Sequence, residues 1–208
     1  MEPEADDWSL LFAWREGDQR AADQLAGRYF PLLMRFFLNK VRNVDDASDL
    51  VSETFLGCSA SRNTSTSSAP FRSYLFAIAM NKLRGYYRKQ SKRRRELDDF
   101  AEVCVDDSLG HTPSSLIGRA QETRLLVRGL RRLNLAQQIV IELAYFEDMR
   151  GREIAELLEI PTSTVHTHLA RGRKRLAEIV AELSENPDLA QSTMTGLETW
   201  CREIRANI

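Results

Sequence analysis

One short segment, residues 152–175, restricts the fold of this chain more than any other. It predicts two short helices joined by a tight turn, because Ile160-Pro161 interrupts apolar residues that recur at helical spacing, and Thr162 is placed to cap the second helix. The apolar positions are Ile154, Ala155 and Leu158 in the first helix and Val165, Leu169, Leu176 and Ile179 in the second. This pattern is typical of a helix-turn-helix, whose second helix enters the major groove of DNA.

The polar side of the second helix favours DNA as its partner. No acidic residue occurs from Ile160 to Arg175, and basic residues toward the far end of the helix are placed to meet phosphates. The predicted DNA-facing side chains are Ser163, Thr164, His166, Thr167, Arg171 and Lys174. The alternative is an ordinary helical hairpin with a solvated basic face.

Charge is distributed unevenly along the chain, although the net charge is only −1 at pH 7. Residues 71–95 contain nine Lys or Arg and no acid, whereas residues 96–107 contain six acids and no base. A phosphate backbone responds to local potential, so the near-neutral total does not exclude nucleic acid. Tyr86 and Tyr87 lie within the basic segment, and rings among cations suit single-stranded nucleic acid. The alternative is a solvated helix end with Tyr86 in the core.

The chain is predicted to be all-α, because no strand pattern is convincing. Helical patterns occur at residues 8–14, 18–29, 32–41 (with Pro31 in its first turn), 46–55, from Phe71 onward, 116–133, and 138–146 (with Asn134 as its cap). A polar loop, residues 59–70, separates the fourth pattern from the fifth.

Two small helical domains are expected from this order of elements. The predicted division is a first domain at 1–95, a flexible acidic linker at 96–118, a second domain with the helix-turn-helix at 119–183, and a C-terminal extension at 184–208. Trp200 in the extension suggests a small amphipathic helix that docks on a domain or a partner, and disorder of the tail is the alternative.

The residue inventory argues against several classes of protein. Cys58, Cys104 and Cys201 lie far apart, so neither a disulfide framework nor a zinc site is expected. No catalytic carboxylate pair, activated nucleophile or metal cluster is evident, so we predict a protein that is not an enzyme and that needs no cofactor. No apolar run approaches the ~18 residues of a membrane helix and no secretory signal is visible, so a cytoplasmic protein without membrane insertion is expected.

Three segments in fixed order resemble a known family. Residues 45–56, residues 71–81 and the helix-turn-helix are similar to the sigma-70 family of RNA polymerase sigma factors, in the short two-domain form of the extracytoplasmic-function (ECF) group. The resemblance covers about residues 8 to 183. It implies a protein that binds core RNA polymerase, recognises the −35 and −10 promoter elements and promotes strand opening. It also implies an anti-sigma factor as a further candidate partner.

The resemblance assigns roles to three sets of residues. Binding to the clamp helices of the largest polymerase subunit falls to Asp46, Asp49, Leu50, Glu53 and Phe55. The residues implied to open and hold the −10 element are Asn81, Arg84, Tyr86, Tyr87 and Arg88, and the neighbouring Lys89 adds positive charge. In the preceding loop, Arg62 and Asn63 are candidates to receive a base flipped out of the stack. The −35 element would face Ser163, Thr164, His166, Thr167, His168 and Arg171, with Lys174 one turn further on.

The chain departs from the family pattern at several positions. Gly57-Cys58-Ser59 stands where a Trp is frequent, Gly85 lies inside the basic helix, and Glu159 occupies a turn position where Gly is common. A positive φ at Glu159 would cost ~1 kcal/mol. The runner-up function is a free-standing helix-turn-helix regulator with a sensor or dimerisation domain, but it does not explain the acidic docking helix and the Tyr-Tyr basic end together.

Overall fold

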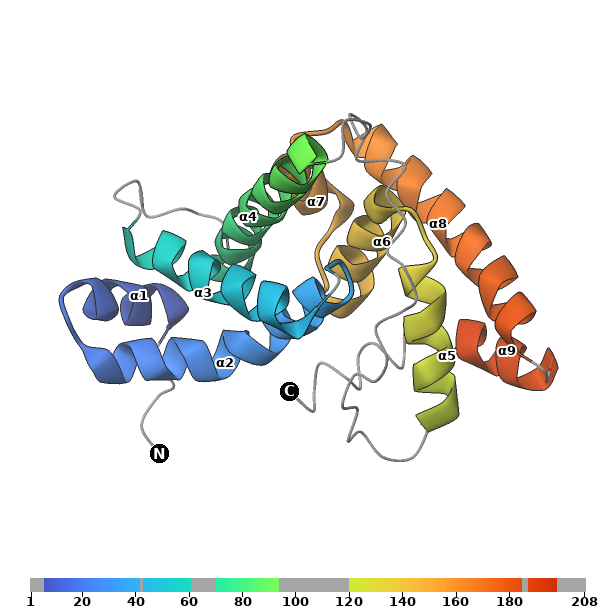
Figure 1. Ribbon diagram of the computed structural model, residues 1–208, viewed down its shortest axis with the longest axis horizontal. Coiled ribbons are helices and arrows are strands. Elements are labelled where there is room, and N and C mark those ends of the chain that lie inside the picture. The colour runs from blue at the N-terminus through green and yellow to red at the C-terminus, as the bar shows by residue number, and fades with distance from the viewer. Residues whose placement is uncertain (1–5, 42, 61–69, 94–119, 185–186, 198–208) are drawn as a thin grey trace.

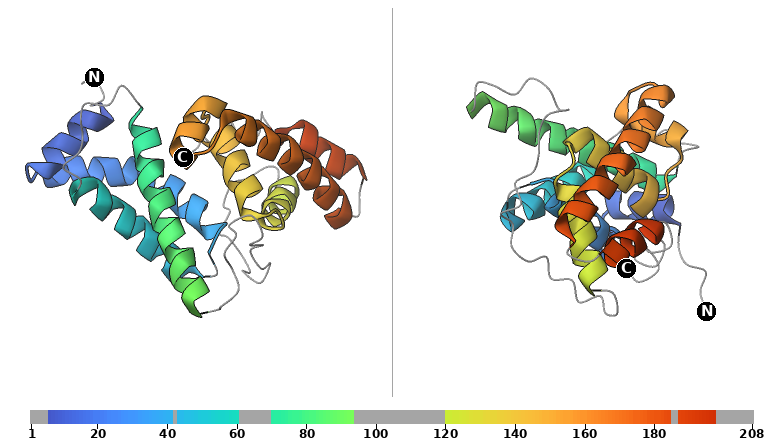
Figure 2. Two further views of the ribbon diagram at one scale, coloured as in Figure 1. Left: turned by 90° about the horizontal axis from the view of Figure 1, so that it is seen from above. Right: turned by 90° about the vertical axis from the view of Figure 1, so that its right-hand side faces the viewer.

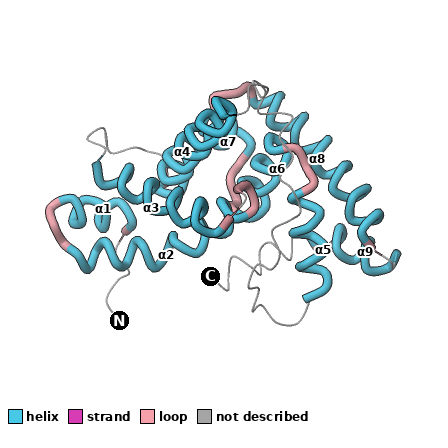
Figure 3. The backbone as a smooth tube through the Cα atoms, viewed as in Figure 1, coloured by secondary structure: helices cyan, strands magenta, loops and turns pink. Residues whose placement is uncertain are grey.

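The described part of the chain folds entirely into helices and loops (Figure 3). The computed structural model describes residues 6–41, 43–60, 70–93, 120–184 and 187–197. The helices are α1 (Asp7–Arg15), α2 (Gln19–Leu38), α3 (Val44–Ala60), α4 (Phe71–Arg93), α5 (Ala120–Arg131), α6 (Leu135–Ile141) with the π-helical turn η1 (Glu142–Phe146), α7 (Gly151–Leu158), α8 (Thr162–Leu183) and α9 (Pro187–Thr195). The all-α prediction is confirmed for these residues.

Helices α1–α4 form the N-terminal half (Figure 1). They share an aromatic-rich core. Phe36 and Phe37 of α2 are fully buried, and the Phe36 ring meets Phe76 of α4 edge to face at 5.2 Å. Leu33 and Leu75 fill the same layer with no exposed surface. Burying a side chain of this size contributes about 1.5–3 kcal/mol, so this core fixes α2 against α4.

The prediction of two helices over residues 18–41 was wrong. α2 runs without a break from Gln19 to Leu38 and contains Pro31 in its interior. Proline removes one backbone hydrogen bond and crowds the preceding turn, at a cost of ~3 kcal/mol. Tyr29, Leu32 and Leu33 on either side of Pro31 are all buried. The free energy gained by burying these neighbours outweighs the cost of a proline inside the helix. This burial depends on other helices, so the local sequence pattern could not predict it.

Helix ends agree with the predicted caps at two places and differ at a third. The Asp18 side chain accepts from the backbone N–H of Arg20 at 2.9 Å, and Asn134 accepts from Gln137 at 2.9 Å. Thr162, in contrast, is the first residue of α8 and not its cap. The carbonyl of Pro161 accepts from the N–H of Thr164 at 2.9 Å, so the extended backbone of the proline starts the helix one residue earlier than predicted.

Gly57 allows α3 and α4 to approach closely. A Cβ atom at this position would lie 2.8 Å from Cγ2 of Ile78, a distance that a side chain cannot tolerate without movement. This crowding gives a physical reason for a glycine at this position of α3. It also fixes the spacing of the two helices that form the groove described below.

Helices α5–α9 form the C-terminal half, in which α5, α6, α8 and α9 pack around a second apolar cluster, whereas the buried residues of α7 belong to the first cluster. α9 packs on both α5 and α8, and Leu197 just beyond it is 2% exposed. The first part of the C-terminal extension is therefore docked on α5 and α8, and residues 198–208, with Trp200, lie outside the described residues.

The two halves are in direct contact. α7 packs against α4, and one apolar cluster includes residues of α1–α4 together with residues of α6, α7 and α8. Figures 1 and 2 show α6 and α7 beside α4 and the C-terminal end of α2. The predicted linker, residues 96–118, lies outside the described residues. No described helix is long and apolar enough to span a bilayer.

Candidate polymerase and nucleic-acid interfaces

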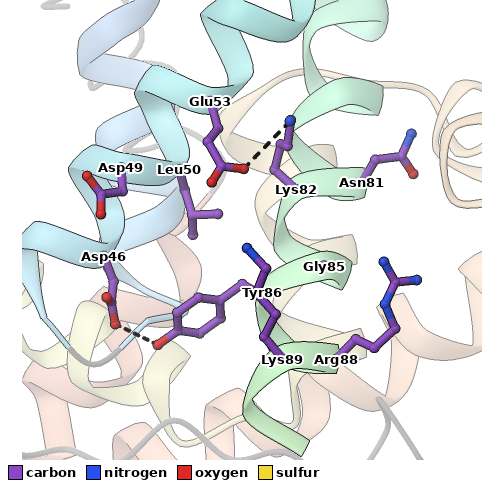
Figure 4. Close-up of a pocket in the computed structure, with 10 residues that line it drawn as sticks. All are labelled: Asp46, Asp49, Leu50, Glu53, Asn81, Lys82, Gly85, Tyr86, Arg88 and Lys89. Atoms are coloured by element: carbon purple, nitrogen blue, oxygen red, sulfur yellow. Dashed lines mark hydrogen bonds and ion pairs between the residues drawn. The ribbon is translucent and has the colours of Figure 1, made fainter. Parts of the chain in front are cut away.

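A groove of about 470 Å³ runs between α3 and α4 (Figure 4). It is lined by Asp46, Asp49, Leu50 and Glu53 from α3 and by Asn81, Lys82, Gly85, Tyr86, Arg88 and Lys89 from α4. The structure thus places four of the five residues predicted to bind polymerase opposite four of the eight predicted to bind the −10 element. One wall of the groove is acidic and the other is basic.

Two contacts join the walls of this groove. The Tyr86 hydroxyl donates to Asp46 Oδ2 at 2.8 Å, and Lys82 Nζ lies 3.6 Å from Glu53 Oε2 (Figure 4). Both contacts are only partly buried, so water screens the Lys82–Glu53 pair and its contribution is small. The acidic side chains therefore remain accessible to an incoming surface while they help to place the tyrosine.

The predicted polymerase-binding residues differ in exposure along α3. Asp49 is exposed and Asp46 and Glu53 are half-buried, whereas Leu50 is 5% exposed and belongs mainly to the core. Phe55 points away from the groove toward α1, with its ring 6.4 Å from that of Trp14. The sequence prediction missed Leu56, which is 65% exposed. The sequence feature that could have identified Leu56 is an apolar residue that lies outside the buried stripe of α3.

Tyr86 and Tyr87 each have one side anchored in the protein. Both rings are half-buried, pack edge to face at 5.4 Å, and contact the apolar core. The Tyr87 hydroxyl donates to the backbone carbonyl of Lys40, as Tyr86 does to Asp46. The alternative with Tyr86 in the core is thus partly realised, and a stacked base would have to use the remaining face of each ring.

The other predicted −10 residues lie along the outer surface of α4. Asn81, Arg88 and Lys89 are exposed, and Arg84 donates to Asn81 Oδ1 at 3.2 Å. Arg84 also donates to the backbone carbonyl of Leu158 in the C-terminal half at 2.9 Å. Arg62 and Asn63 lie outside the described residues.

The predicted −35 residues form one accessible face of α8. Ser163, His166, Thr167, Arg171 and Lys174 are exposed, whereas Thr164 and His168 are half-buried. The opposite face carries Val165, Leu176 and Ile179, which are at most 1% exposed. α7 and α8 pack together as the two helices of the predicted motif. The helix-turn-helix is confirmed, with basic side chains on the side of α8 that faces solvent.

The turn between α7 and α8 contains a strained residue. Glu159 has φ 60° and ψ 40°, which is the left-handed region that favours glycine. The next residue, Ile160, donates its N–H to the carbonyl of Ala155 at 3.1 Å, a bond of the kind that closes helix C-termini in this conformation. The turn therefore requires a left-handed backbone conformation at position 159, and glutamate adopts this conformation at a cost in conformational free energy.

Replacing Glu159 by glycine should stabilise the protein. Because glycine adopts the left-handed conformation freely, we expect Glu159→Gly to raise the free energy of unfolding by ~1 kcal/mol. Urea denaturation followed by circular dichroism measures the change. The control, Glu156→Gly within α7, should lower it by ~1 kcal/mol, since glycine weakens a helix interior. A lower stability for Glu159→Gly would show that the carboxylate makes a contact worth more than the strain.

The chain thus has the features of a two-part DNA-binding protein. Its N-terminal half carries a groove with one acidic and one basic wall, and its C-terminal half contains a helix-turn-helix with a basic face. The family comparison identifies it further. The model of sigma-70 region 2 matches residues 25–93, and the model of sigma-70 region 4 matches residues 123–176. Together they span more than half of the chain. The chain belongs to the sigma-70 family: it is an RNA polymerase sigma factor of the ECF group, which initiates transcription without being an enzyme.

Relatives of this family align along most of the chain. The ECF RNA polymerase sigma-E factor of Haemophilus influenzae is 23% identical over 189 residues, covering 88% of this chain and 100% of its own. The ECF sigma factor SigW of Bacillus subtilis is 24% identical over 178 residues, covering 81% and 94%.

Two solved structures have a similar fold. CnrH in complex with the cytosolic domain of CnrY has a TM-score of 0.60 at 24% identity, covering 87% of this chain and all of that one. The sigma factor RpoE of Bartonella quintana in complex with the anti-sigma factor NepR has a TM-score of 0.64 at 20% identity, covering 78% and 98%.

Proposed function

We propose that the parts of the chain divide the work of promoter recognition. Residues 1–95 dock on the clamp helices of core RNA polymerase and hold the −10 element, and residues 119–183 bind the −35 element. Residues 96–118 link the two, and residues 184–208 are a C-terminal extension, of which α9 packs on α5 and α8. The single observation that carries this division is the groove between α3 and α4, where an acidic wall and a basic wall stand side by side.

Polymerase docking is proposed for α3, at the acidic wall of the groove and the surface next to it. Asp49 is exposed there and Asp46 and Glu53 are half-buried, so a basic partner surface can reach all three carboxylates. Leu56 is exposed one turn beyond Glu53 and offers apolar area on the same helix. Charged groups around an apolar contact give an interface both register and fast association.

The −10 and −35 contacts are proposed for α4 and α8. Arg88 and Lys89 of α4 are exposed beside Tyr86, so phosphates and an unstacked base can be held together. On α8, Arg171 and Lys174 lie on the same side as Ser163, His166 and Thr167, which suits a helix in the major groove.

An anti-sigma factor is proposed as a third partner. The two structural relatives described above were solved with protein partners, the cytosolic domain of CnrY and the anti-sigma factor NepR. In this chain the groove between α3 and α4 is open and charged on both walls, so a segment that occupied it would compete with polymerase.

Run-off transcription with core RNA polymerase on a fragmented genomic library tests the proposed function. Transcripts that start only when the protein is present should share two upstream elements near −35 and −10. A matched variant, Arg171→Ala with Lys174→Ala, should lose these transcripts while still binding core. If the protein instead bound duplex DNA tightly by itself and gave no new start sites with core, a free-standing regulator would be the better explanation.

A further inference from the structure

Arg15, the last residue of α1, contacts the ends of two other helices. Its Nε and Nη2 atoms donate to the backbone carbonyl of Cys58 at 3.2 Å and 2.5 Å, and Nη2 also donates to the Tyr74 hydroxyl at 3.3 Å. Cys58 lies in the last turn of α3, and Tyr74 lies in the first turn of α4. A single half-buried guanidinium therefore joins the C-terminal end of α3 to the N-terminal end of α4.

The contact with Cys58 is a helix cap supplied by a distant side chain. The last four carbonyls of a helix have no partner within the helix, and the Cys58 carbonyl is one of these in α3. The last turn of α3, all of which is described, contains no basic residue of its own. A cation at this end interacts favourably with the helix dipole, and hydrogen bonds from a charged donor are stronger than neutral ones. Arg15 therefore fixes the place where α3 ends.

The thiol of Cys58 takes no part in this contact. Its side chain is 1% exposed, and burial raises the pKa of the thiol to about 12, although the nearby Arg15 charge acts in the opposite direction. The sulfur therefore stays protonated near neutral pH and is not a reactive thiolate. Arg15 acts on the backbone of α3, so its effect is on the position of the helix end.

The contact with Tyr74 is equally well anchored. The Tyr74 ring packs against Trp8 of α1, with ring centroids 5.1 Å apart, and against Phe71, with centroids 6.0 Å apart. These rings hold the Tyr74 hydroxyl in place as an acceptor at the start of α4. Because both partners of Arg15 are fixed, loss of the guanidinium should loosen one helix end relative to the other.

The two helix ends enclose the segment that carries candidate base contacts. α3 ends at Ala60 and α4 begins at Phe71, and the sequence between them contains Arg62 and Asn63. Side chains that recognise a ligand must be held to within about 0.5 Å, and supporting contacts behind them provide this precision. The contacts of Arg15 lie at the points where this segment leaves α3 and enters α4.

We propose that Arg15 is a positioning residue for base recognition in the −10 element, because it fixes the ends of the segment between α3 and α4. Arg15 itself does not contact DNA in this proposal. The functional consequence rests on the proposed −10 role of Arg62 and Asn63. Loss of Arg15 should therefore weaken discrimination between −10 bases and leave discrimination between −35 bases unchanged.

Run-off transcription with core RNA polymerase on two series of promoters tests this role. One series changes single bases of the −10 element, and the other changes single bases of the −35 element. The measured quantity is the ratio of transcript from the unchanged promoter to transcript from each substituted promoter, which does not depend on the amount of active protein. Where the parent discriminates about tenfold at a −10 base, we expect Arg15→Met to discriminate only about twofold, with parental ratios at −35.

Three further variants separate positioning from folding. Arg28→Met removes another half-buried arginine of the N-terminal half, which pairs with Asp7 of α1 at 2.6 Å, and should keep both ratios. Tyr74→Phe removes only the hydroxyl and should lower the −10 ratio to an intermediate value, even if Arg15→Met folds poorly. Arg15→Met/Tyr74→Phe should match Arg15→Met, because the hydroxyl acts through the guanidinium. Circular dichroism measures the helicity of each variant.

Replacement of the candidate base contacts distinguishes failure of the two ideas. Arg62→Ala/Asn63→Ala should lower the −10 ratio as Arg15→Met does. If it does so while Arg15→Met and Tyr74→Phe keep the parental ratio, the positioning role of Arg15 is overturned. An equal loss of the −10 and −35 ratios in Arg15→Met would also overturn it. If only Arg15→Met and Tyr74→Phe lower the −10 ratio, Arg15 positions other −10 contacts and the role of Arg62 and Asn63 is wrong.

Discussion

Reversing two acidic charges on α3 should abolish assembly with core RNA polymerase. In Asp49→Lys/Glu53→Lys the proposed docking surface becomes basic, and like charges facing each other across an interface cost several kcal/mol, or about a hundredfold in affinity. Asp49 is exposed and Glu53 half-buried, so the fold should tolerate both changes. Co-purification with core and run-off transcription measure the loss.

The matched control reverses two acids away from the groove. Glu16 at the end of α1 and Asp23 of α2 are exposed and do not line the groove, and Glu16→Lys/Asp23→Lys changes the net charge equally. It should assemble with core like the parent. If the α3 variant still bound core while the control did not, polymerase docking would have to be placed on α1 and α2.

Local patterns were sufficient to predict the helix-turn-helix. The apolar stripe of α8 is set by side chains three and four apart, and Val165, Leu176 and Ile179 lie on the buried face as expected. The strain at Glu159, in contrast, was expected on the condition of a positive φ and from the family resemblance, because Gly is common at this turn position; the positive φ is observed.

Long-range packing could not be predicted in the same way. The continuity of α2 through Pro31 depends on the burial of Tyr29 and Leu32 against other helices. The groove likewise forms only because α3 and α4 lie side by side. The hydrogen bond between Tyr86 and Asp46 therefore cannot be inferred from the sequence of either helix alone. Lys40 illustrates the limit most clearly, because a lysine with no exposed surface has its partner 102 residues away.

Removing either tyrosine ring should reduce strand opening more than initial promoter binding. Stacking on a base contributes ~1–3 kcal/mol, so Tyr86→Ala and Tyr87→Ala should each lower open-complex formation by about tenfold. Permanganate footprinting of the melted region measures opening, and gel shift of the polymerase complex measures initial binding. Alanine variants that open DNA like the parent would show that the rings serve only as packing.

Phenylalanine variants separate the ring from its anchor. Tyr86→Phe removes the hydrogen bond to Asp46, and Tyr87→Phe removes the one to the Lys40 carbonyl, while each keeps its ring. If stacking dominates, both should open DNA close to the parental rate. A defect confined to Tyr87→Phe would instead show that its hydroxyl matters. Lys40 also pairs with Glu142 of the C-terminal half, so that result would show that the contact between the halves helps to position the Tyr87 ring.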